Sequence, residues 1–474
     1  MKRRKKRKLK RWVKPSLGLL IIVIIILLLI PFYNKKKNDN NNLKNNINMD
    51  KVISNIEDKI NDPKIDADFL KWVSNNYKEK SLESLSKYLE KNDYDKSIWH
   101  KITNNSLVVL QDLYNDNYTK LDNVKQINGI KDEITLSFVG DVSLADNWYI
   151  MPKYDERGKK VYGILSDSVV KIMNDSDIMI ANNEFTVSER GEKMPGKYYT
   201  FRASPKRLSI YEEMGVDLVT LANNHVYDFG KTAFYDMLDA LKEYNIPYIG
   251  AGKNIEEAKK PYYYIINGYK IAFINATRAE KLILTPEATE DEGGVFRCYD
   301  PKNFAESIKQ AKEKSDYVVA LIHWGKEDSH DLEEVQKETS RTYIDSGADI
   351  IVGTHAHTLQ GIEYYNNKPI IYNLGDFIFN NETKDTGIFQ IKMTKDGDLS
   401  YYFIPCLEKD EYTKVLEGEE KQRVITNMNT WSINASINES GEIKEASWLS
   451  LFCLFAIVNK SKGDTSNNVK ILLK

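Results

Sequence analysis

Cysteine is scarce in this chain, with three residues among 474: Cys298, Cys406 and Cys453. An odd count at wide spacing argues against a disulfide framework of the kind that stabilises small secreted domains. It also argues against a cysteine-based zinc site, because such sites need several thiolates at close spacing. We therefore expect the fold to rest on its hydrophobic core, and any bound metal to be held by other ligands.

Long uncharged runs are also rare, and one of them lies at residues 15–33, PSLGLLIIVIIILLLIPFY. About 20 apolar residues cross a bilayer as a helix, so this run is long enough. The first 14 residues hold ten Lys and Arg, a basic flank that should stay in the cytoplasm. Neither a small-residue cleavage site nor a cysteine follows the run, which disfavours a signal peptide or a lipoprotein. The prediction is a single-pass cell-membrane protein with a cytoplasmic N-terminus and an extracellular body.

The chain beyond this anchor divides by composition. After the basic tail (1–14) and the anchor (15–33), residues 34–50 are rich in Asn and Lys and are predicted to be a flexible linker. Residues 51–127 show helical spacing, as at Ile53, Ile56 and Ile60, and predict a helical membrane-proximal region.

Residues 407–474 form a C-terminal extension. Its apolar run 448–458 is too short to span a membrane, and we expect burial, with a membrane or partner contact as the alternative. The net acidic body gives no reason to expect nucleic acid.

The main domain is predicted at residues 133–406. Short apolar runs alternate there with amphipathic segments such as FYDMLDALKEYN and NFAESIKQAKEKS. This alternation predicts an α/β fold with substantially parallel sheet. After Ile388 the pattern changes to strands without helices. The strands are expected at Ile134–Val139, Ile178–Ala181, Leu218–Leu221, Lys270–Ile274, Tyr317–Ile322, Ile350–Val352, Ile370–Asn373, Phe389–Met393 and Tyr401–Ile404.

Polar side chains follow five of these strands at the point where each ends. In open α/β sheets, ligand sites gather at the carboxyl ends of the strands. We therefore expect the clusters to meet, although a Gly-Asp pair such as Gly140-Asp141 is also common in a plain turn. The polar residues in these clusters include Asp141, Asn182, Glu184, Asn224, His225, His323, Glu327, His355 and His357.

The residue types in these clusters favour a metal site. Four of the six histidines lie there, and His nitrogen mixed with carboxylate and amide oxygen suits zinc, manganese or iron. His355 and His357, two apart on an extended segment, should point the same way. The alternative is a hydrogen-bonded core histidine. A bridged pair of ions would generate hydroxide near neutral pH and act on phosphorus. Asp228 is expected to cap the next helix rather than to act in catalysis.

These residues also carry a family resemblance. The segments FVGDVSL, ANNEFTVS, LANNHVYDFG, IHWGKE, the run from Asp345 to Phe379 and FIPC together resemble the CapA/PgsA family of poly-gamma-glutamate capsule proteins, which is similar to calcineurin-like metallophosphoesterases. The resemblance implies a metallophosphoesterase-like sandwich of two sheets flanked by helices. It implies a role in synthesis or export of poly-gamma-glutamate or a related anionic envelope polymer. The implied partners are that polymer and membrane-embedded synthase subunits.

The resemblance also assigns roles. Asp141 and His357 would bind a first metal, with Glu184 as the bridging carboxylate. Asn224, His323 and His355 would bind the second metal. His225 would protonate a leaving oxygen, and Asn182 and Glu327 would orient ligands.

Three positions depart from the usual pattern: Ser143 and Glu184 stand where phosphoesterases have His and Asp, and Asp376 stands where Asn is usual. The first metal position is thereby weakened. The prediction is one or two divalent ions, with a single ion held by Glu184, Asn224, His323 and His355 as the safer form.

Two functions remain open at this stage. One is an accessory subunit that binds an anionic polymer and assembles with a synthase. The other is an extracellular metal-dependent hydrolase, which clustered histidines favour because a scaffold does not need them. A purely structural surface protein leaves the clusters unexplained.

Overall fold

The computed structural model describes residues 123–127, 131–267, 269–280, 284–395 and 397–446. The predicted basic tail, anchor and linker, most of the predicted helical region and the apolar run 448–458 lie outside these ranges. Within them, no helix combines the length and the apolar character that a membrane crossing requires. The anchor therefore stays a prediction.

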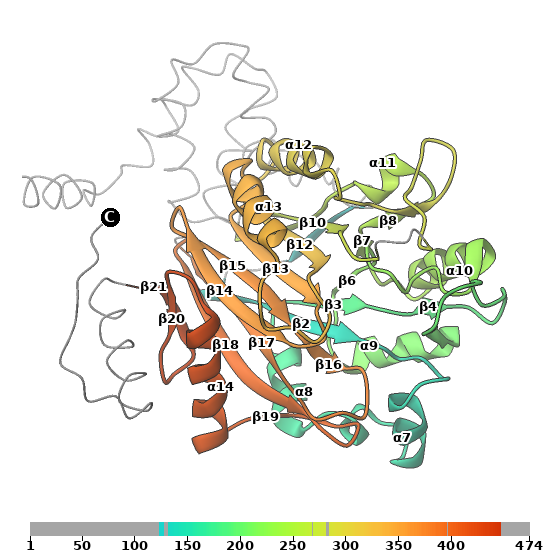
Figure 1. Cartoon of the computed structure of the whole chain (residues 1–474), viewed down its shortest axis with the longest axis horizontal. Coiled ribbons are helices and arrows are strands. Elements are labelled where there is room, and N and C mark those ends of the chain that lie inside the picture. Colours follow the sequence, from blue (N-terminus) through green and yellow to red (C-terminus); the bar gives the residue numbers. More distant parts are fainter. Residues whose placement is uncertain (1–122, 128–130, 268, 281–283, 396, 447–474) are drawn as a thin grey trace, which may run out of the picture. The chain divides into compact units, whose positions relative to one another are not determined.

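The first sheet has a parallel centre with antiparallel strands toward both sides (Figure 1). Its central strands β10, β12, β13 and β15 run parallel, and β9 and β14 pair antiparallel with β10 and β15. In spatial order the strands are β1 (Val124–Ile127), β9 (Tyr262–Ile266), β10 (Tyr269–Thr277), β12 (Tyr317–Trp324), β13 (Ile350–His355), β15 (Lys368–Leu374) and β14 (Leu359–Tyr365).

The second sheet is also mixed, with an antiparallel half and a parallel half that meet at β2. Its spatial order is β20 (Ala435–Ile437), β21 (Glu442–Glu445), β18 (Leu399–Glu408), β17 (Lys384–Thr394), β2 (Glu133–Val142), β3 (Ile178–Asn183), β6 (Leu218–Thr220) and β7 (Tyr248–Ile249), with β16 (Asp376–Ile378) beside β2 and β19 (Thr413–Val415) beside β18. Two small pairs, β4 (Thr186–Val187) with β5 (Arg202–Ala203) and β8 (Ala251–Gly252) with β11 (Gly294–Val295), lie outside both sheets.

The two sheets pack face to face over a shared apolar core. Phe138 of β2 contacts Phe273 of the first sheet, with ring centroids 6.4 Å apart, and also Phe389 of its own sheet at 5.7 Å. Side chains alternate along each strand. In β3, Ile178 and Ile180 therefore face this core while Met179 and Ala181 face the opposite side. Such alternation on both sheets leaves each with a second apolar face to cover.

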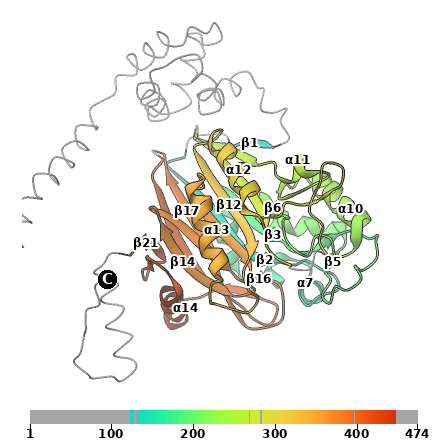
Figure 2. The ribbon, with the colours of Figure 1, turned by 45° about the horizontal axis from the view of Figure 1, so that its top comes forward.

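Helices cover those outer faces, which gives four layers in all (Figure 2). On the first sheet lie α12 (Pro301–Lys312) and α13 (Glu334–Asp345), whose Phe304 and Tyr343 rings are 5.0 Å apart. On the second sheet lie α7 (Ile150–Glu156), α8 (Asp167–Asn174), α9 (Ser209–Glu213) and α10 (Gly230–Glu243). The described residues also form α11 (Ile255–Ala258) and α14 (Gly418–Trp431).

Local sequence explains where the predicted helix near residues 303–315 begins. Asp300 accepts a hydrogen bond from the backbone N–H of Lys302, and Pro301 occupies the first helical position of α12, where no N–H is needed. Phe304, Ile308 and Ala311 then recur on one face and are buried. This face packs α12 against the first sheet.

The α/β class and the nine predicted strands are present in the structure. Three expectations differ. Residues 124–127, predicted as the end of a helical region, form β1, because they pair with β9. The predicted domain end at residue 406 lies inside β18, and the sheet continues to Glu445. Helix α14 follows Ile388, where only strands were expected, and buries Val424, Ile425 and Met428.

Candidate metal site

The predicted polar clusters meet at the carboxyl ends of strands from both sheets. The second sheet brings Asp141 at the end of β2, Asn182 and Glu184 after β3, and Asn224 and His225 after β6. The first sheet brings His323 near the end of β12 and His355 at the end of β13. A hydrogen bond of 3.0 Å from the backbone N–H of His355 to Oδ2 of Asp141 joins the two sheets here.

Gly140 permits the close approach that positions Asp141. The backbone N–H of Asp141 donates to the carbonyl oxygen of Gly375 over 2.9 Å. A Cβ atom on Gly140 would lie 1.8 Å from that same oxygen, so no larger residue fits without movement. The Gly-Asp pair is therefore more than a turn signal, because the glycine lets β2 reach the neighbouring segment and the aspartate faces the site.

Glu184, His323 and His355 form the inner group of candidate ligands. All three are buried, and one ligand atom from each lies within 4.8 Å of the others. Nε2 of His323 lies 3.5 Å from Oε1 of Glu184 and donates to Oδ1 of Asn224 at 2.8 Å. The four residues predicted to hold a single ion therefore lie together.

Asn182 contacts three of the candidate ligands. Its Nδ2 donates to Asp141 at 2.8 Å and to Glu184 at 3.1 Å, and also lies 3.3 Å from Nδ1 of His323. Its Oδ1 accepts from the side chains of Thr220 and Asn223. One amide thus fixes two carboxylates relative to an imidazole.

The backbone at the two neighbouring histidines is not extended, contrary to the sequence expectation. His355 has φ of 96° and His357 has φ of 54°, a region that non-glycine residues rarely adopt. The two rings nevertheless lie 5.9 Å apart. Such conformations cost about 1–3 kcal/mol and persist where the surroundings hold them, most often at functional sites.

His357 belongs to a second group with Asp141 and Asp376. Its Nδ1 lies 2.6 Å from Oδ1 of Asp376 and 3.7 Å from Oδ2 of Asp141. Burial alone lowers the pKa of His357, but the two carboxylates raise it to about 9. Asp376, where Asn is usual, thus pairs with the histidine predicted to bind the first metal.

The two histidines of the inner group, unlike His357, have lowered pKa values. Burial lowers the pKa of His323 and of His355 well below the ordinary value, so both imidazoles are neutral at pH 7. Burial also raises the pKa of Glu184 well above its usual range, and the Asp141 carboxylate adds to this. Neutral imidazole is the form that binds a cation, and a cation would favour ionised Glu184.

These residues fit a divalent cation. Oε1 of Glu184 and Nδ1 of His355 are buried and have no hydrogen-bond partner, although buried polar atoms are nearly always paired. Both atoms belong to the inner group. Two nitrogens with carboxylate and amide oxygens suit manganese, zinc or iron. In the second group, His357 is already paired as an imidazolium with the carboxylates of Asp141 and Asp376. This group is therefore the poorer position for a metal ion.

His225 is held by Asp228, whose role the sequence analysis misassigned. Nδ1 of His225 lies 2.8 Å from Oδ2 of Asp228. Asp228 was expected to cap a helix, but α10 begins at Gly230 without a side-chain cap. The buried carboxylate instead pairs with Lys197 at 2.6 Å and accepts from the backbone N–H of Phe201 at 2.7 Å. Lys197 lies in a segment without periodicity, so no sequence signal indicated it.

Glu327 and Ser143 are the remaining positions that the sequence analysis singled out. The Glu327 side chain is 60% exposed, with Oε1 3.9 Å from Nε2 of His355, which is too far to orient that ring directly. Ser143, where phosphoesterases usually have His, is buried and its Oγ has no hydrogen-bond partner.

Comparison with known proteins matches this domain to capsule synthesis proteins. The family described as "Bacterial capsule synthesis protein PGA_cap" matches residues 135–381. The chain is 32% identical over 275 residues to the "PGA biosynthesis protein CapA" of Bacillus subtilis (strain 168), covering 56% of this chain and 69% of that protein. It is 28% identical over 306 residues to the "Capsule biosynthesis protein CapA" of Bacillus anthracis, covering 62% and 72%. A "Probable polyglutamine synthesis accessory protein" of Mycobacterium tuberculosis (strain ATCC 25618 / H37Rv) is 26% identical over 212 residues, covering 43% and 56%.

Proposed function

The chain belongs to the CapA/PgsA family of bacterial capsule synthesis proteins, and from this we propose that it takes part in synthesis or export of poly-gamma-glutamate or a related anionic envelope polymer. The relatives in Bacillus and Mycobacterium support this role, since they are named for capsule or polymer synthesis. The accessory description of the mycobacterial relative supports action beside a membrane-embedded synthase. The N-terminal basic tail and apolar run support an anchored protein with its body outside the cell.

The site adds a metal-dependent, metallophosphoesterase-like pocket to this proposal. The observation that carries it is the pair of unpartnered ligand atoms, Oε1 of Glu184 and Nδ1 of His355, buried beside His323. Glu184, Asn224, His323 and His355 would hold the ion. A bound divalent ion would act as a Lewis acid and lower the pKa of water for attack on an ester.

The chain's own residues supply the proton chemistry. Asp228 accepts the N–H of Nδ1 of His225, so the proton that His225 would give to a leaving oxygen is the one on Nε2 of its imidazolium form. Lys197 and the backbone N–H of Phe201 hold Asp228 in place. Asn182 keeps Asp141 and Glu184 in register with His323.

The alternative is an extracellular metal-dependent hydrolase that is not dedicated to capsule. The paired His225 and Asp228 favour it, since a polymer-binding scaffold has no need of an oriented, buried histidine. The two functions can coexist in one protein.

Cell-level complementation tests the polymer role. In the source bacterium, loss of this chain should remove or reduce the cell-bound polymer, and the wild-type chain should restore it. Unchanged polymer would exclude the role. The His323→Ala variant separates the two functions, because a purely accessory protein would still restore the polymer. The His330→Ala variant is the matched control, since His330 lies outside the candidate metal groups and stacks on Trp431.

Enzyme assays and topology complete the test. The metal-loaded full-length chain should be assayed on a phosphodiester and on poly-gamma-glutamate. Bound metal without turnover of either bond would favour the accessory function. Protease added to intact cells should remove the body, and full protection would overturn the proposed orientation.

A further inference from the structure

Four aromatic side chains, which we call the aromatic shelf, lie together beside the site. They are Trp148, Tyr149, Tyr198 and Tyr199. Trp148 contacts Tyr149 and Tyr199 at ring-centroid distances of 4.6 and 5.9 Å, and Tyr198 contacts Tyr199 at 4.8 Å. Tyr198 is 90% exposed, Tyr199 55% and Tyr149 43%. Large rings exposed as a group on a soluble domain mark a binding surface more often than isolated ones do.

Ring contacts connect the shelf to the candidate metal site. Phe201 lies 4.9 Å from Trp148 and 4.4 Å from the ring of His225. It also lies 5.3 Å from Phe379, which in turn is 4.8 Å from His357. A continuous chain of ring contacts therefore connects the exposed tyrosines to His225 and His357.

The backbone that carries the shelf is held firmly. Next to Tyr198, Lys197 is buried and pairs with Asp228 and Glu280. On the other side, the Asn147 side chain donates to the carbonyl oxygen of Thr200 and accepts from the backbone N–H of Arg202. These contacts fix the backbone on both sides of the exposed rings, which lowers the entropy cost of binding.

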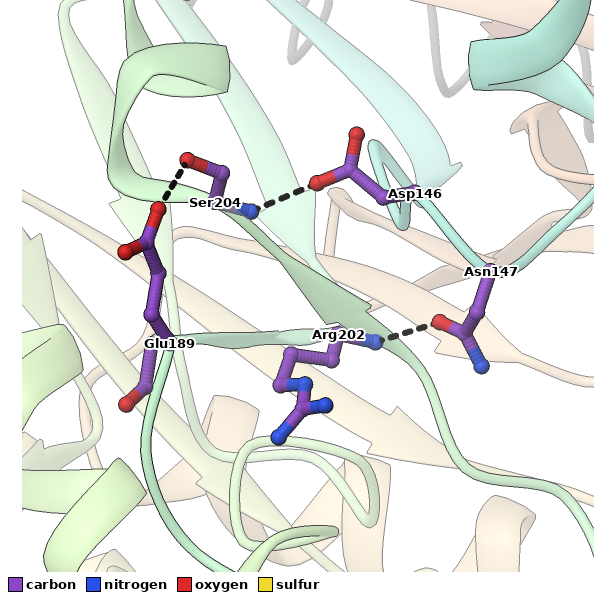
Figure 3. Close-up of a pocket in the computed structure, with 6 residues that line it drawn as sticks. Asp146, Asn147, Glu189, Arg202 and Ser204 are labelled. Atoms are coloured by element: carbon purple, nitrogen blue, oxygen red, sulfur yellow. Dashed lines mark hydrogen bonds between the residues drawn. The ribbon is translucent and has the colours of Figure 1, made fainter.

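The two segments that carry the rings also line a polar cavity of about 350 Å³ (Figure 3). Asp146, Glu189 and Arg202 are among its lining residues, together with Asn147, Ser188 and Ser204. The carboxylates of Asp146 and Glu189 accept from Ser204, and Arg207 donates to the other oxygen of Asp146 over 2.7 Å. Each carboxylate oxygen keeps a further lone pair for a ligand hydroxyl. Carboxylates beside aromatic faces suit a ring that carries hydroxyl groups.

We propose that the aromatic shelf binds the sugar ring of a sugar-phosphate ester whose phosphate lies at the candidate metal site. This inference rests on the proposed phosphoesterase-like pocket. The aromatic faces take the C–H face of the ring, and the polar cavity beside them, which two carboxylates and the Arg202 guanidinium line, takes its hydroxyl groups. A glutamyl chain has neither feature, so the shelf points to a phosphate-linked sugar rather than to the polyglutamate backbone.

Binding to the purified, metal-loaded full-length chain tests the proposal. The probes are glucose 1-phosphate, uridine 5′-monophosphate and the ringless glycerol 1-phosphate, titrated by calorimetry. Glucose 1-phosphate should bind roughly tenfold more tightly than glycerol 1-phosphate, from stacking alone. The double variant Tyr198→Ala/Tyr199→Ala should lose this preference and keep its affinity for glycerol 1-phosphate. Tyr244→Ala, at an exposed tyrosine at the end of α10, is the matched control and should keep the preference.

Each outcome decides the proposal. Equal affinity for glucose 1-phosphate and glycerol 1-phosphate would overturn it. A preference for glucose 1-phosphate that survives the double substitution would overturn it as well. Tight binding of uridine 5′-monophosphate alone would also overturn it, because the base and not the sugar would then be recognised. To separate this from failure of the metal site, methyl glucoside is compared with glycerol in the His323→Ala variant. A preference there that depends on Tyr198 and Tyr199 supports the shelf even if no metal binds, and its absence counts against the shelf alone.

Discussion

The carboxylate of Asp228 lies 2.8 Å from Nδ1 of His225, in a position where less than a tenth of either side chain is exposed. This contact fixes the orientation of the His225 ring and uses its Nδ1 atom. The same carboxylate pairs with the buried Lys197. Three residues from two separate segments therefore act as one unit at the edge of the candidate metal site.

Replacing Asp228 with Asn should destabilise the protein by about 3 kcal/mol, because Lys197 loses the nearer of its two carboxylate partners while it stays buried. Urea unfolding measures the loss. Removing the buried Lys197 charge as well, in Asp228→Asn/Lys197→Met, should recover part of the lost stability. Strictly additive costs for the two substitutions would contradict the coupling. If the chain is a hydrolase, Asp228→Asn should also slow turnover without changing the metal content.

Replacing Gly140 with Ala should cost about 3 kcal/mol and lower the metal content, because the new Cβ would collide with the carbonyl oxygen of Gly375. Thermal or urea unfolding and metal analysis check the two effects. Gly158→Ala is the comparison: Gly158 has φ of 99° with open space around it, so its variant tests conformational strain alone. It should cost about 1 kcal/mol and leave the metal content unchanged. Equal effects of the two variants on metal would count against the steric argument.

The pair of His357 and Asp376 predicts a pH dependence in the metal-free protein. The folded-state pKa of His357 is raised to about 9, against an ordinary value near 6.5. Its stabilising effect is therefore full below about pH 6.5 and is lost as the pH rises through 9. Asp376→Asn should remove this effect. The difference in unfolding free energy between wild type and variant should be at most about 3 kcal/mol near pH 6 and should shrink above pH 9. A difference that grows with pH would contradict the assignment.

The same substitution tests how many ions bind. Asp376→Asn restores the residue that the family usually has and frees His357 from its charged pair. We expect the variant to bind a second ion more tightly than the wild type does. Calorimetric titration with the metal measures the number of bound ions and their affinities. An unchanged number would show that Ser143, rather than Asp376, limits binding of the second ion.

Much of the site was predictable because its residues follow buried apolar strands. Parallel strands place their carboxyl ends at one edge, so Asp141 and Glu184 of the second sheet could be expected together. The approach of His323 to them depends on the packing of the first sheet against the second, which strand patterns do not give. The resemblance then supplied roles that strand patterns do not contain. The nine strands could also be predicted from the sequence, since each is a short apolar run between polar segments.

Other features depend on tertiary contacts that leave no local pattern. Asp228 precedes a helix and has the character of a cap, yet its side chain turns toward His225 because Lys197 and Phe201 reach it from a distant segment. The left-handed backbone at His355 follows from the hydrogen bond of its N–H to Asp141, 214 residues away. Helix α14 was missed because its first half is mostly charged and its buried residues Val424, Ile425 and Met428 make only a short apolar pattern.

The metal content of the purified full-length chain tests the central claim most directly. Plasma mass spectrometry should find about one manganese, zinc or iron ion per chain in the wild type and in His330→Ala. The content should fall severalfold in both His323→Ala and His355→Ala, since each removes a ligand nitrogen from the inner group. Wild-type protein that binds none of these ions when they are supplied, or equal content in all four proteins, would contradict the account.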